Sequence, residues 1–594
     1  MLMQAMTTNV TSKKKISGFY KKNHACILII FLTVFILNIF ISCKQELPVL
    51  LSIDPKIGRM GEVITLTGSN FGEFDDESYV TIAGISPTFS SYQIWQDDLI
   101  IVRVPELGES GLVYVHSRGR KSNGLLFSNT AFVPRPAEGE ELGLAPRITS
   151  ISPQTGVPGS VITITGSNFG LSRDSSLQAS SQQAASGVFF SWDYESGSYN
   201  PYMVKEPEYT EVSEIESGYV YWSSREIRVR IPDGAVSGNI EVRTPHGSSR
   251  PFYFDISGKP GTKNLKDKRI YTITYSVDIR VLEATRPNTL YLWIPKPVIS
   301  PSQRNVSLIS RNTEPFLENH RGVSLYKLDN LGSGVNQSVN LSFWIETYAV
   351  ESSVRVQSVR QETTALSVIH TQSTALIPGN EPQIRTIVNS ITGREQNPYI
   401  KTRAIYDWIA ANIELTGILP YTELTDPVTA LEQRQADSYT TALLFTAMTR
   451  AAGVPCIPIA GVLIDQSGQT IRHYWAEFWI DGLGWIPVDP VIAAGVKQAA
   501  DVDYTDALFQ IILERLGDGG DSLDLANYYF GNMDNQRIAF SRGDISLSQM
   551  ESRGRIVSHS QSYSLQNIWE EAAGGLESYT SLWGDIVISG MYIQ

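Results

Sequence analysis

Two stretches of this chain repeat one another at a constant spacing, and this repeat constrains the fold more than any other feature. Ile53–Pro55 returns as Ile151–Pro153, and Thr67–Gly72 returns as Thr165–Gly170, each 98 residues later. A chain of 594 residues is long enough for several domains. We therefore expect two consecutive copies of one folding unit.

The spacing between the copies widens further along the chain. Trp95 and Pro105 correspond to Trp222 and Pro232, which lie 127 residues later. The second copy therefore carries an insertion of 29 residues. We place it at about 173–218, a stretch rich in serine, glutamine, alanine and tyrosine.

Each copy has the pattern of short β-strands separated by turns. Val63–Thr67 and Val161–Thr165 are β-branched runs, and the Gly-Ser-Asn-Phe-Gly that each leads into supplies turn conformations. Such a pattern predicts a β-sandwich. The residues resemble the IPT/TIG family, whose pattern is I-x-P-x-x-G-x-x-G, a strand, and G-x-x-F-G. The resemblance implies two all-β immunoglobulin-like sandwiches, at 47–135 and 145–258, that act as spacers or interaction modules.

The N-terminal segment has the character of an export signal. Lysines at 13–15 and 21–22 precede an apolar run over 25–42, and Cys43 follows. The ending resembles the bacterial lipobox, which implies a signal peptide over 1–42 and a lipid on Cys43. The alternative is an uncleaved membrane anchor, because a run of this length could just span a bilayer. Either interpretation predicts an extracytoplasmic, membrane-anchored protein in the periplasm or at the cell surface.

Charge and cysteine content exclude several partners and kinds of site. The formal charge of −13 repels phosphate backbones, so we expect no nucleic-acid partner. Apart from Cys26 and Cys43, the sequence contains one cysteine, Cys456. Apart from a pair that Cys43 and Cys456 could form, we therefore expect no disulfide framework, and we expect no cysteine-based zinc site. We also expect no cofactor.

The second half of the chain begins with more β structure. From Tyr271 to Val281, apolar residues at odd positions alternate with polar residues at even positions, which predicts a half-buried strand. Further strands at Thr289–Ile294 and Val339–Ile345 complete a third β domain, predicted over 265–360. Gly258–Thr262 is interpreted as the linker that precedes it.

A buried helix and a β-hairpin follow this β domain. Tyr439–Ala452 is apolar almost all round, which predicts a central buried helix. Arg472–Ile480 alternates and, with the returning strand Trp485–Asp489, predicts a hairpin. The hairpin brings His473 and Asp489 roughly opposite each other, where the carboxylate could orient the imidazole.

Three motifs in this region match one family pattern in order. Arg450–Pro455 fits R-A-x-G-(I/V)-P, His473–Glu477 fits H-x-W-x-E, and Gly484–Pro490 fits G-W-x-x-x-D-P. These residues resemble the transglutaminase-like superfamily, a branch of the papain-like fold. The tail segments Tyr529–Asp534 and Arg537–Ser541 are also similar to that family.

The resemblance completes the predicted architecture. It implies an α+β transglutaminase-like domain over 375–545, after the two sandwiches and the third β domain. A C-terminal extension over 546–594 follows, and we predict a short helix in it around Ile568–Ala572.

The family's catalytic triad falls on Ser438, His473 and Asp489, and the nucleophile departs from the family pattern. The family's cysteine corresponds to Ser438. A cysteine at a helix N-terminus beside a histidine forms a thiolate readily, whereas a serine hydroxyl ionises far above neutral pH. Cys456 lies beyond the end of the helix, and we interpret it as a small apolar core residue. His473 and Asp489 either retain a catalytic role or persist as a buried polar pair.

Three functions remain open at this point. The first is a lipid-anchored, non-catalytic protein that binds a peptide or glycopeptide at the cell envelope. The second is an acyl-transfer enzyme, an amide hydrolase or cross-linker, with Ser438 as nucleophile, His473 as base and Asp489 as orienting group. The third is a structural envelope protein with a filled cleft. The expected partners are the membrane, through a lipid on Cys43, and a peptide, protein or cell-wall ligand.

Overall fold

The computed structural model describes most of the chain after the N-terminal segment. It covers residues 47–593 except 76–77, 89–90, 106–109, 130–143, 175–185, 196–206, 214–217, 321, 362–363, 417–425, 500–505, 518, 552 and 560–561. The predicted signal peptide and Cys43 lie outside the described residues. Within the described part, no helix combines the length and the apolar character that a bilayer crossing requires.

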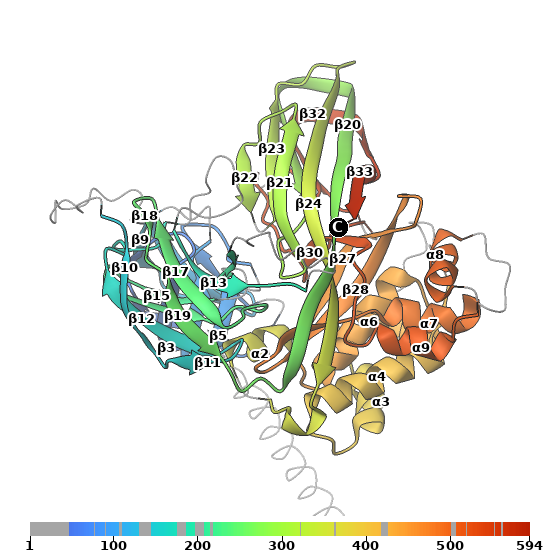
Figure 1. Ribbon diagram of the computed structural model, residues 1–594. Coiled ribbons are helices and arrows are strands. Elements are labelled where there is room, and N and C mark those ends of the chain that lie inside the picture. Colours follow the sequence, from blue (N-terminus) through green and yellow to red (C-terminus); the bar gives the residue numbers. More distant parts are fainter. Residues whose placement is uncertain are drawn as a thin grey trace, which may run out of the picture.

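The first repeat copy is a sandwich of two sheets, drawn in blue in Figure 1, and its strands pair antiparallel except β2 with β9. One sheet has the order β1-β3-β6-β5, formed by Val49–Asp54, Val63–Ser69, Leu99–Arg103 and Tyr92–Trp95. The other has the order β2-β9-β7-β4, formed by Ile57–Gly58, Leu125–Asn129, Gly111–Ser117 and Tyr79–Ile82, with β8 (Arg120–Lys121) beside β7. Alternate residues of the facing strands, such as Ile64, Leu66, Val113 and Val115, are fully buried between the sheets.

The second copy repeats this sandwich and adds a strand. Its first sheet has the order β10-β12-β16-β15, formed by Arg147–Ser152, Val161–Ser167, Glu226–Arg230 and Tyr219–Trp222. Its second has the order β11-β19-β17-β13-β14, formed by Thr155–Gly156, Phe252–Ile256, Gly238–Thr244, Gly187–Trp192 and Glu208–Glu211, with β18 (Gly247–Ser248) beside β17. β13 occupies the place of β4, because Val188 pairs with Val242 as Val80 pairs with Val115. Among the described strands, β14 is therefore the addition within 173–218.

The third β domain is organised around one very long strand, β20 (Gly261–Pro295). β20 pairs with β24 (Asn336–Val354), β23 (Val323–Asp329), β32 (Glu570–Trp583) and β33 (Val587–Ile593). The sheet continues through β21 (Gln303–Arg311), β22 (Leu317–His320) and β31 (Arg555–Val557). Figure 1 shows this sheet above the rest of the molecule.

Two local predictions are corrected in this domain. The predicted linker at 258–262 runs directly into β20, since Gly261 pairs with Val354 and Thr262 with Ser353. The helix predicted around 568–572 is wrong, because Glu570 begins strand β32. Pairing with a distant strand decides both segments, and local propensity cannot reveal it.

The remaining domain combines helices with a small sheet and lies between the two parts of the third β domain in the sequence. Its sheet has the order β29-β28-β27-β30, formed by Gly484–Val488, Thr470–Ile480, Cys456–Ile464 and Arg537–Arg542. The longer helices are α3 (Pro382–Thr392), α4 (Pro398–Asn412), α6 (Ser438–Ala451), α7 (Pro490–Ala499) and α8 (Ala507–Leu516). Shorter elements are α2 (Ala365–His370), α5 (Pro427–Gln433), α9 (Ser522–Tyr528) and the paired β25 (Glu414–Leu415) and β26 (Gln435–Ala436).

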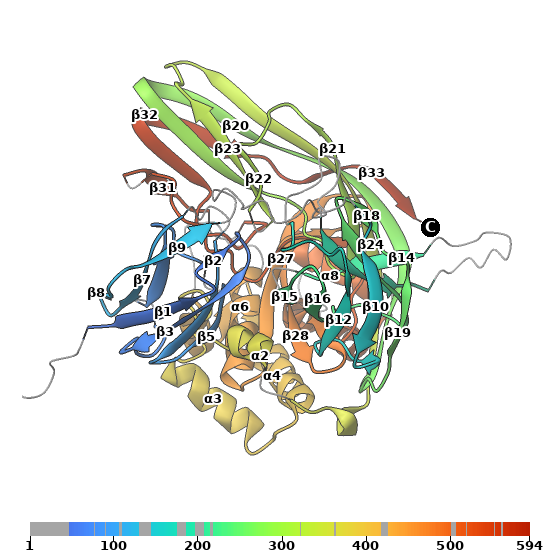
Figure 2. The same cartoon turned by 90° about the vertical axis from the view of Figure 1, so that its left-hand side faces the viewer.

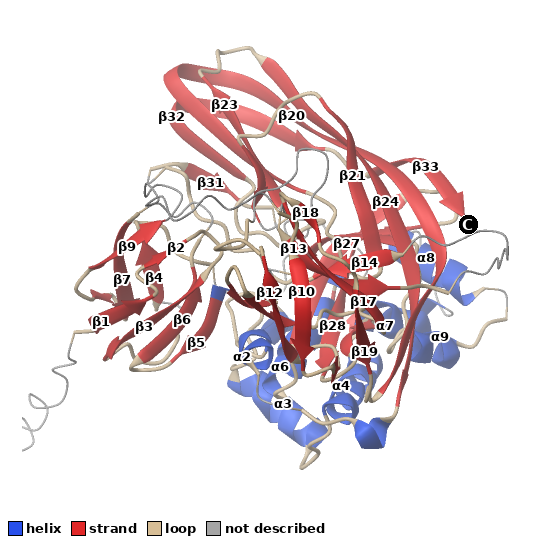
Figure 3. Cartoon of the chain, turned by 60° about the vertical axis from the view of Figure 1, so that its left-hand side comes forward, coloured by secondary structure: helices blue, strands red, loops and turns tan. Residues whose placement is uncertain are grey.

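The layers of this domain place α6 at its centre. α6 packs against β27 and β28 on one side and against α3, α4 and α7 on others. The helices gather at one end of the molecule, while strands form the rest (Figure 3). In the view of Figure 2, α2 lies beside the first sandwich, where it packs against β5.

Candidate active site

Ser438 is the first residue of the buried helix α6. Asp437 caps the helix, because its carboxylate accepts a hydrogen bond from the Thr440 amide at 2.6 Å. Gly453 follows the helix in the left-handed conformation, with φ of 78°. The sequence prediction of a central helix ending at Gly453 is therefore confirmed, and Ser438 stands at its N-terminus with only 4% of its surface exposed.

The hairpin of β28 and β29 supplies the other two predicted side chains. The strands pair from Ile480 and Gly484 as far as Ala476 and Val488. His473 lies further along β28, and Asp489 directly follows β29.

Asp489 fixes the orientation of the imidazole ring. His473 Nε2 and Asp489 Oδ2 lie 2.7 Å apart, and both side chains are fully buried. The other carboxylate oxygen accepts a hydrogen bond from the Ile492 amide at 3.0 Å, in the first turn of α7. Two groups thus hold the carboxylate in place. Because a carboxylate oxygen accepts hydrogen bonds, the contact favours the imidazole tautomer that carries its proton on Nε2.

His473 presents its other nitrogen to Ser438. Ser438 Oγ lies 3.4 Å from His473 Nδ1. With the proton on Nε2, the lone pair of Nδ1 can accept the serine hydroxyl hydrogen. The structure therefore brings the three side chains together in the order Ser438–His473–Asp489. The serine contact is long for a hydrogen bond from a hydroxyl, and the histidine–aspartate contact is short.

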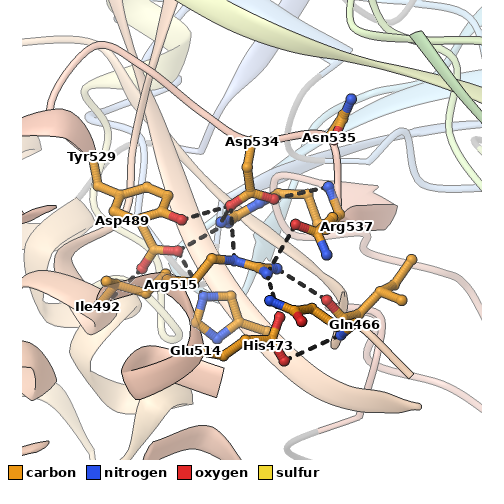
Figure 4. A network of polar contacts seen from close by, with 12 residues as sticks. Gln466, His473, Asp489, Ile492, Glu514, Arg515, Tyr529, Asp534, Asn535 and Arg537 are labelled. Atoms are coloured by element: carbon orange, nitrogen blue, oxygen red, sulfur yellow. Dashed lines mark hydrogen bonds and ion pairs between the residues drawn. The ribbon is translucent and has the colours of Figure 1, made fainter. Parts of the chain in front are cut away.

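Buried charges extend the site beyond the three predicted residues (Figure 4). Arg537 donates to Asp489 Oδ2 at 2.9 Å and to Asp534 Oδ2 at 2.8 Å. Asp534 also accepts from the Tyr529 hydroxyl at 2.7 Å and lies 3.6 Å from Arg515 Nε. Sequence reasoning noted the tail segments that contain Tyr529, Asp534 and Arg537 but assigned them no role, and it did not note Arg515.

These contacts determine the ionisation of the two carboxyls. Burial alone would raise the pKa of Asp489, but His473 and Arg537 outweigh it and lower that pKa. Burial alone would likewise raise the pKa of Asp534, but Arg537 and Arg515 outweigh it, and this pKa is lowered as well. Both groups are therefore carboxylates at neutral pH, and Asp489 cannot serve as a proton donor there.

Aromatic side chains enclose the site. The Trp475 ring lies roughly parallel to the His473 ring, with centroids 6.1 Å apart, and the Arg537 guanidinium lies 5.1 Å from the Trp475 ring centre. Tyr439, which follows Ser438 and is half-buried, meets Tyr474 edge-to-face at 5.1 Å. Trp475, the tryptophan of the H-x-W-x-E motif, thus lies beside the histidine.

The C-terminal extension reaches this neighbourhood. The Tyr474 hydroxyl donates to the Ser562 carbonyl at 2.7 Å, and the Leu565 amide donates to Ser541 Oγ at 2.9 Å. A cavity of about 40 Å³, large enough for a few water molecules, lies beside the site. Its lining includes Trp475, Glu477, Arg537 and Arg542, and Glu477 pairs with Arg542 at 2.6 Å.

Cys456 lies in the core of the domain. Cys456 is a buried free cysteine on β27, and burial raises the pKa of its thiol to about 12. It therefore has the properties of the small core residue that was predicted. In the described part of the chain, no group of three or more His, Cys, Asp and Glu side chains could hold a metal ion.

Comparison with known proteins identifies the domains. Residues 385–490 match the transglutaminase-like superfamily, and residues 48–133 and 146–195 match the IPT/TIG domain. An uncharacterized protein of Haemophilus influenzae is 24% identical over 181 residues, which are 27% of this chain and 46% of that protein. The match thus spans less than half of that relative's length.

Solved structures with a related fold have low similarity to this chain. A putative cysteine protease from Cytophaga hutchinsonii is 14% identical, with a TM-score of 0.32, and covers 56% of this chain and 92% of its own. The periplasmic domain of TgpA from Pseudomonas aeruginosa is also 14% identical, with a TM-score of 0.24, and covers 38% of this chain and 90% of its own. From the two family matches and the architecture described above, the chain carries IPT/TIG immunoglobulin-like domains in its strand-rich N-terminal region, followed by a transglutaminase-like domain.

Proposed function

We propose that the transglutaminase-like domain binds a peptide or glycopeptide at the cell envelope without turning it over. The chain would be held at the membrane through a lipid on Cys43. The observation that carries this proposal is the residue at the nucleophile position. By the sequence resemblance, Ser438 corresponds to the family's cysteine, and its hydroxyl lies 3.4 Å from the histidine that would have to activate it.

Serine at this position makes the chemistry depend on that contact. A cysteine would already be a thiolate beside His473, whereas Ser438 must transfer its proton during attack. Proton transfer takes place over about 2.6–3.2 Å between heavy atoms, so the 3.4 Å contact must shorten before Ser438 can react. Ser438 and His473 are also buried, at 4% and 0% exposure, so a carbonyl group has little access to either.

Residues at the edge of the site support binding. Tyr439 follows Ser438 and remains half-buried, so a ligand that approaches the start of α6 meets a tyrosine ring. Tyrosine offers both an apolar face and a hydrogen-bonding hydroxyl, which suits peptide groups and sugars. Ser438, His473 and Asp489 contact one another, and these contacts hold their side chains in fixed positions beside Tyr439.

A second candidate is favoured by the short contact between His473 and Asp489. In an acyl-transfer reaction, Ser438 Oγ would attack an amide carbon while its proton passes to His473 Nδ1. The same proton would then go to the leaving amine, and water or a second amine would release the acyl group from Ser438. Asp489 would stabilise the imidazolium without taking its proton.

Covalent labelling of the soluble body (residues 44–594) separates the two candidates. We expect a fluorophosphonate probe to leave Ser438 unmodified, as judged by peptide mass spectrometry. Labelling of Ser438 that is lost in His473→Ala would establish the enzyme instead.

Binding itself needs a direct measurement. Synthetic peptides and peptidoglycan fragments would be titrated into the soluble body by calorimetry, with Tyr439→Ala as the variant expected to bind more weakly. Tyr221→Ala, which removes an exposed tyrosine of the second sandwich, serves as the matched control. Equal affinity of the Tyr439→Ala variant and the parent would place the ligand elsewhere.

A further inference from the structure

The second IPT/TIG copy contacts the turn of the hairpin that carries His473 and Asp489. Asp233, between β16 and β17, forms an ion pair with Lys263 at the start of β20. Only 5% and 7% of these two side chains are exposed. Lys263 Nζ also donates a hydrogen bond to the Trp485 carbonyl at 3.1 Å. This bond connects the Asp233–Lys263 ion pair to the start of β29, directly after the hairpin turn.

Glycines allow the two backbones to approach at this contact. Gly484 has φ of 98°, and a Cβ there would lie 2.0 Å from Asp233 Oδ1. Gly159 has φ of 92°, and a Cβ there would lie 2.6 Å from the Trp479 ring. Side chains at either glycine would force the sandwich away from the hairpin.

The stretch assigned to the insertion supplies a second contact. Trp192 is buried and meets Tyr348 of β24 edge-to-face at 5.1 Å, and the Arg304 guanidinium lies 3.9 Å from the Trp192 ring centre. Arg304 also donates to the Tyr209 carbonyl at 2.6 Å. Counting two residues beyond the paired positions Phe190 and Ile82, Trp192 corresponds in the first copy to Gly84, which lies in the turn after β4 and where a Cβ would meet nothing within 4 Å. At this position the second copy therefore docks through a side chain that the first copy lacks, while the first copy contacts α2 through β5.

We propose that the second IPT/TIG copy is a fixed part of the candidate site, with Asp233 as a positioning residue for His473 and Asp489. β28 and β29 are hydrogen-bonded from the turn as far as Ala476 and Val488, and Asp489 comes next. A shift of the turn is therefore passed along both strands to the histidine–aspartate pair. This inference goes beyond the proposed function and holds whether the site binds or catalyses.

Histidine NMR of the soluble body (residues 44–594) tests the positioning role. In protein labelled with ¹⁵N-histidine, the Nε2–H of His473 should give a solvent-protected signal at low field, identified by its absence in His473→Asn. Asp233→Ala removes the buried carboxylate. Glu226→Ala, which breaks an exposed pair on the same sandwich, is the matched control. Asp233→Leu combined with Lys263→Met replaces the ion pair with apolar side chains and should restore docking.

We expect the His473 signal to exchange with solvent at least about tenfold faster in Asp233→Ala, and to be unchanged in the control and the double variant. Amide exchange at Leu483, which donates to the Ile480 carbonyl across the turn, reports docking separately. Slow His473 exchange in Asp233→Ala would overturn the positioning role. Unchanged Leu483 exchange would overturn the docking itself. If Asp233→Ala does not fold, Asp233→Asn, which keeps the shape and an acceptor, makes the same comparison.

Discussion

Replacing Arg537 with methionine should destabilise the transglutaminase-like domain strongly at neutral pH. Arg537 is buried and donates to Asp489 at 2.9 Å and to Asp534 at 2.8 Å. Methionine preserves most of the apolar stem, so the loss is mainly electrostatic. Removing one partner of a buried ion pair costs about 3–5 kcal/mol. The substitution breaks two such pairs, but Asp489 retains its contacts with His473 and the Ile492 amide. We therefore expect a total loss of about 4 kcal/mol in unfolding free energy, not the sum for two pairs.

The loss should depend on pH in a defined direction. Burial alone would raise the pKa values of Asp489 and Asp534, but their charged partners, Arg537 among them, lower both in the folded protein. These carboxylates therefore contribute stability that is present above about pH 4, the unfolded value, and is lost as pH falls through the lower folded value. Without Arg537 both folded pKa values rise, so the buried groups take up protons at higher pH. The destabilisation by Arg537→Met should thus shrink between pH 7 and pH 4.5.

Urea unfolding followed by tryptophan fluorescence at both pH values measures this difference. Arg228→Met is the matched control, because Arg228 has 52% of its side chain exposed and pairs with Glu226 on the same strand. We expect the control to lose no more than about 0.5 kcal/mol. A loss below about 1 kcal/mol for Arg537→Met at pH 7, or the same loss at both pH values, would refute the reasoning.

Three further predictions concern other parts of the domain and its neighbour. Asp437→Ala removes the cap of α6 and should lower the unfolding free energy by about 1 kcal/mol in the same urea assay, while an unchanged midpoint would exclude a capping role. Glu570→Leu leaves the Trp583 indole and the Ser581 hydroxyl without their acceptor in the third β domain, which should cost about 2–3 kcal/mol; a loss as small as that of Arg228→Met would contradict it. Cys456, whose pKa burial raises to about 12, should not react with a disulfide reagent at pH 8 until the protein unfolds, and labelling within minutes in the folded state would disprove this.

The candidate site could be predicted where its signals are local. The helix that begins at Ser438 is apolar almost all round and is followed by a glycine, and the first strand of the hairpin alternates up to a glycine-rich turn. These elements, with three ordered motifs, located Ser438, His473 and Asp489. Arg537 escaped assignment because it lies on β30, 48 residues after the aspartate that it contacts. No spacing rule connects an arginine to such a partner.

The third β domain shows a different limit of sequence reasoning. Gly258–Thr262 has the composition of a linker, and the apolar and glutamate residues of Ile568–Ala572 also suit a helix. Pairing with β24 draws Gly261 and Thr262 into β20, and pairing with β20 makes the segment from Glu570 onward a strand. Both outcomes depend on strands far away in the sequence, so tertiary contacts override the local preference.

The arrangement of β20 also bears on the order in which the chain can fold. One edge of β20 pairs with β32 and β33, which come after the whole transglutaminase-like domain in the sequence. Closing so long a loop is slow, because its entropy must be lost before the new strand pairs form. If the transglutaminase-like domain has already folded, it holds the two ends of the intervening chain close together and so shortens the loop that must close. We therefore expect the inserted domain to fold first and the long sheet to be completed last, by the final strand of the chain.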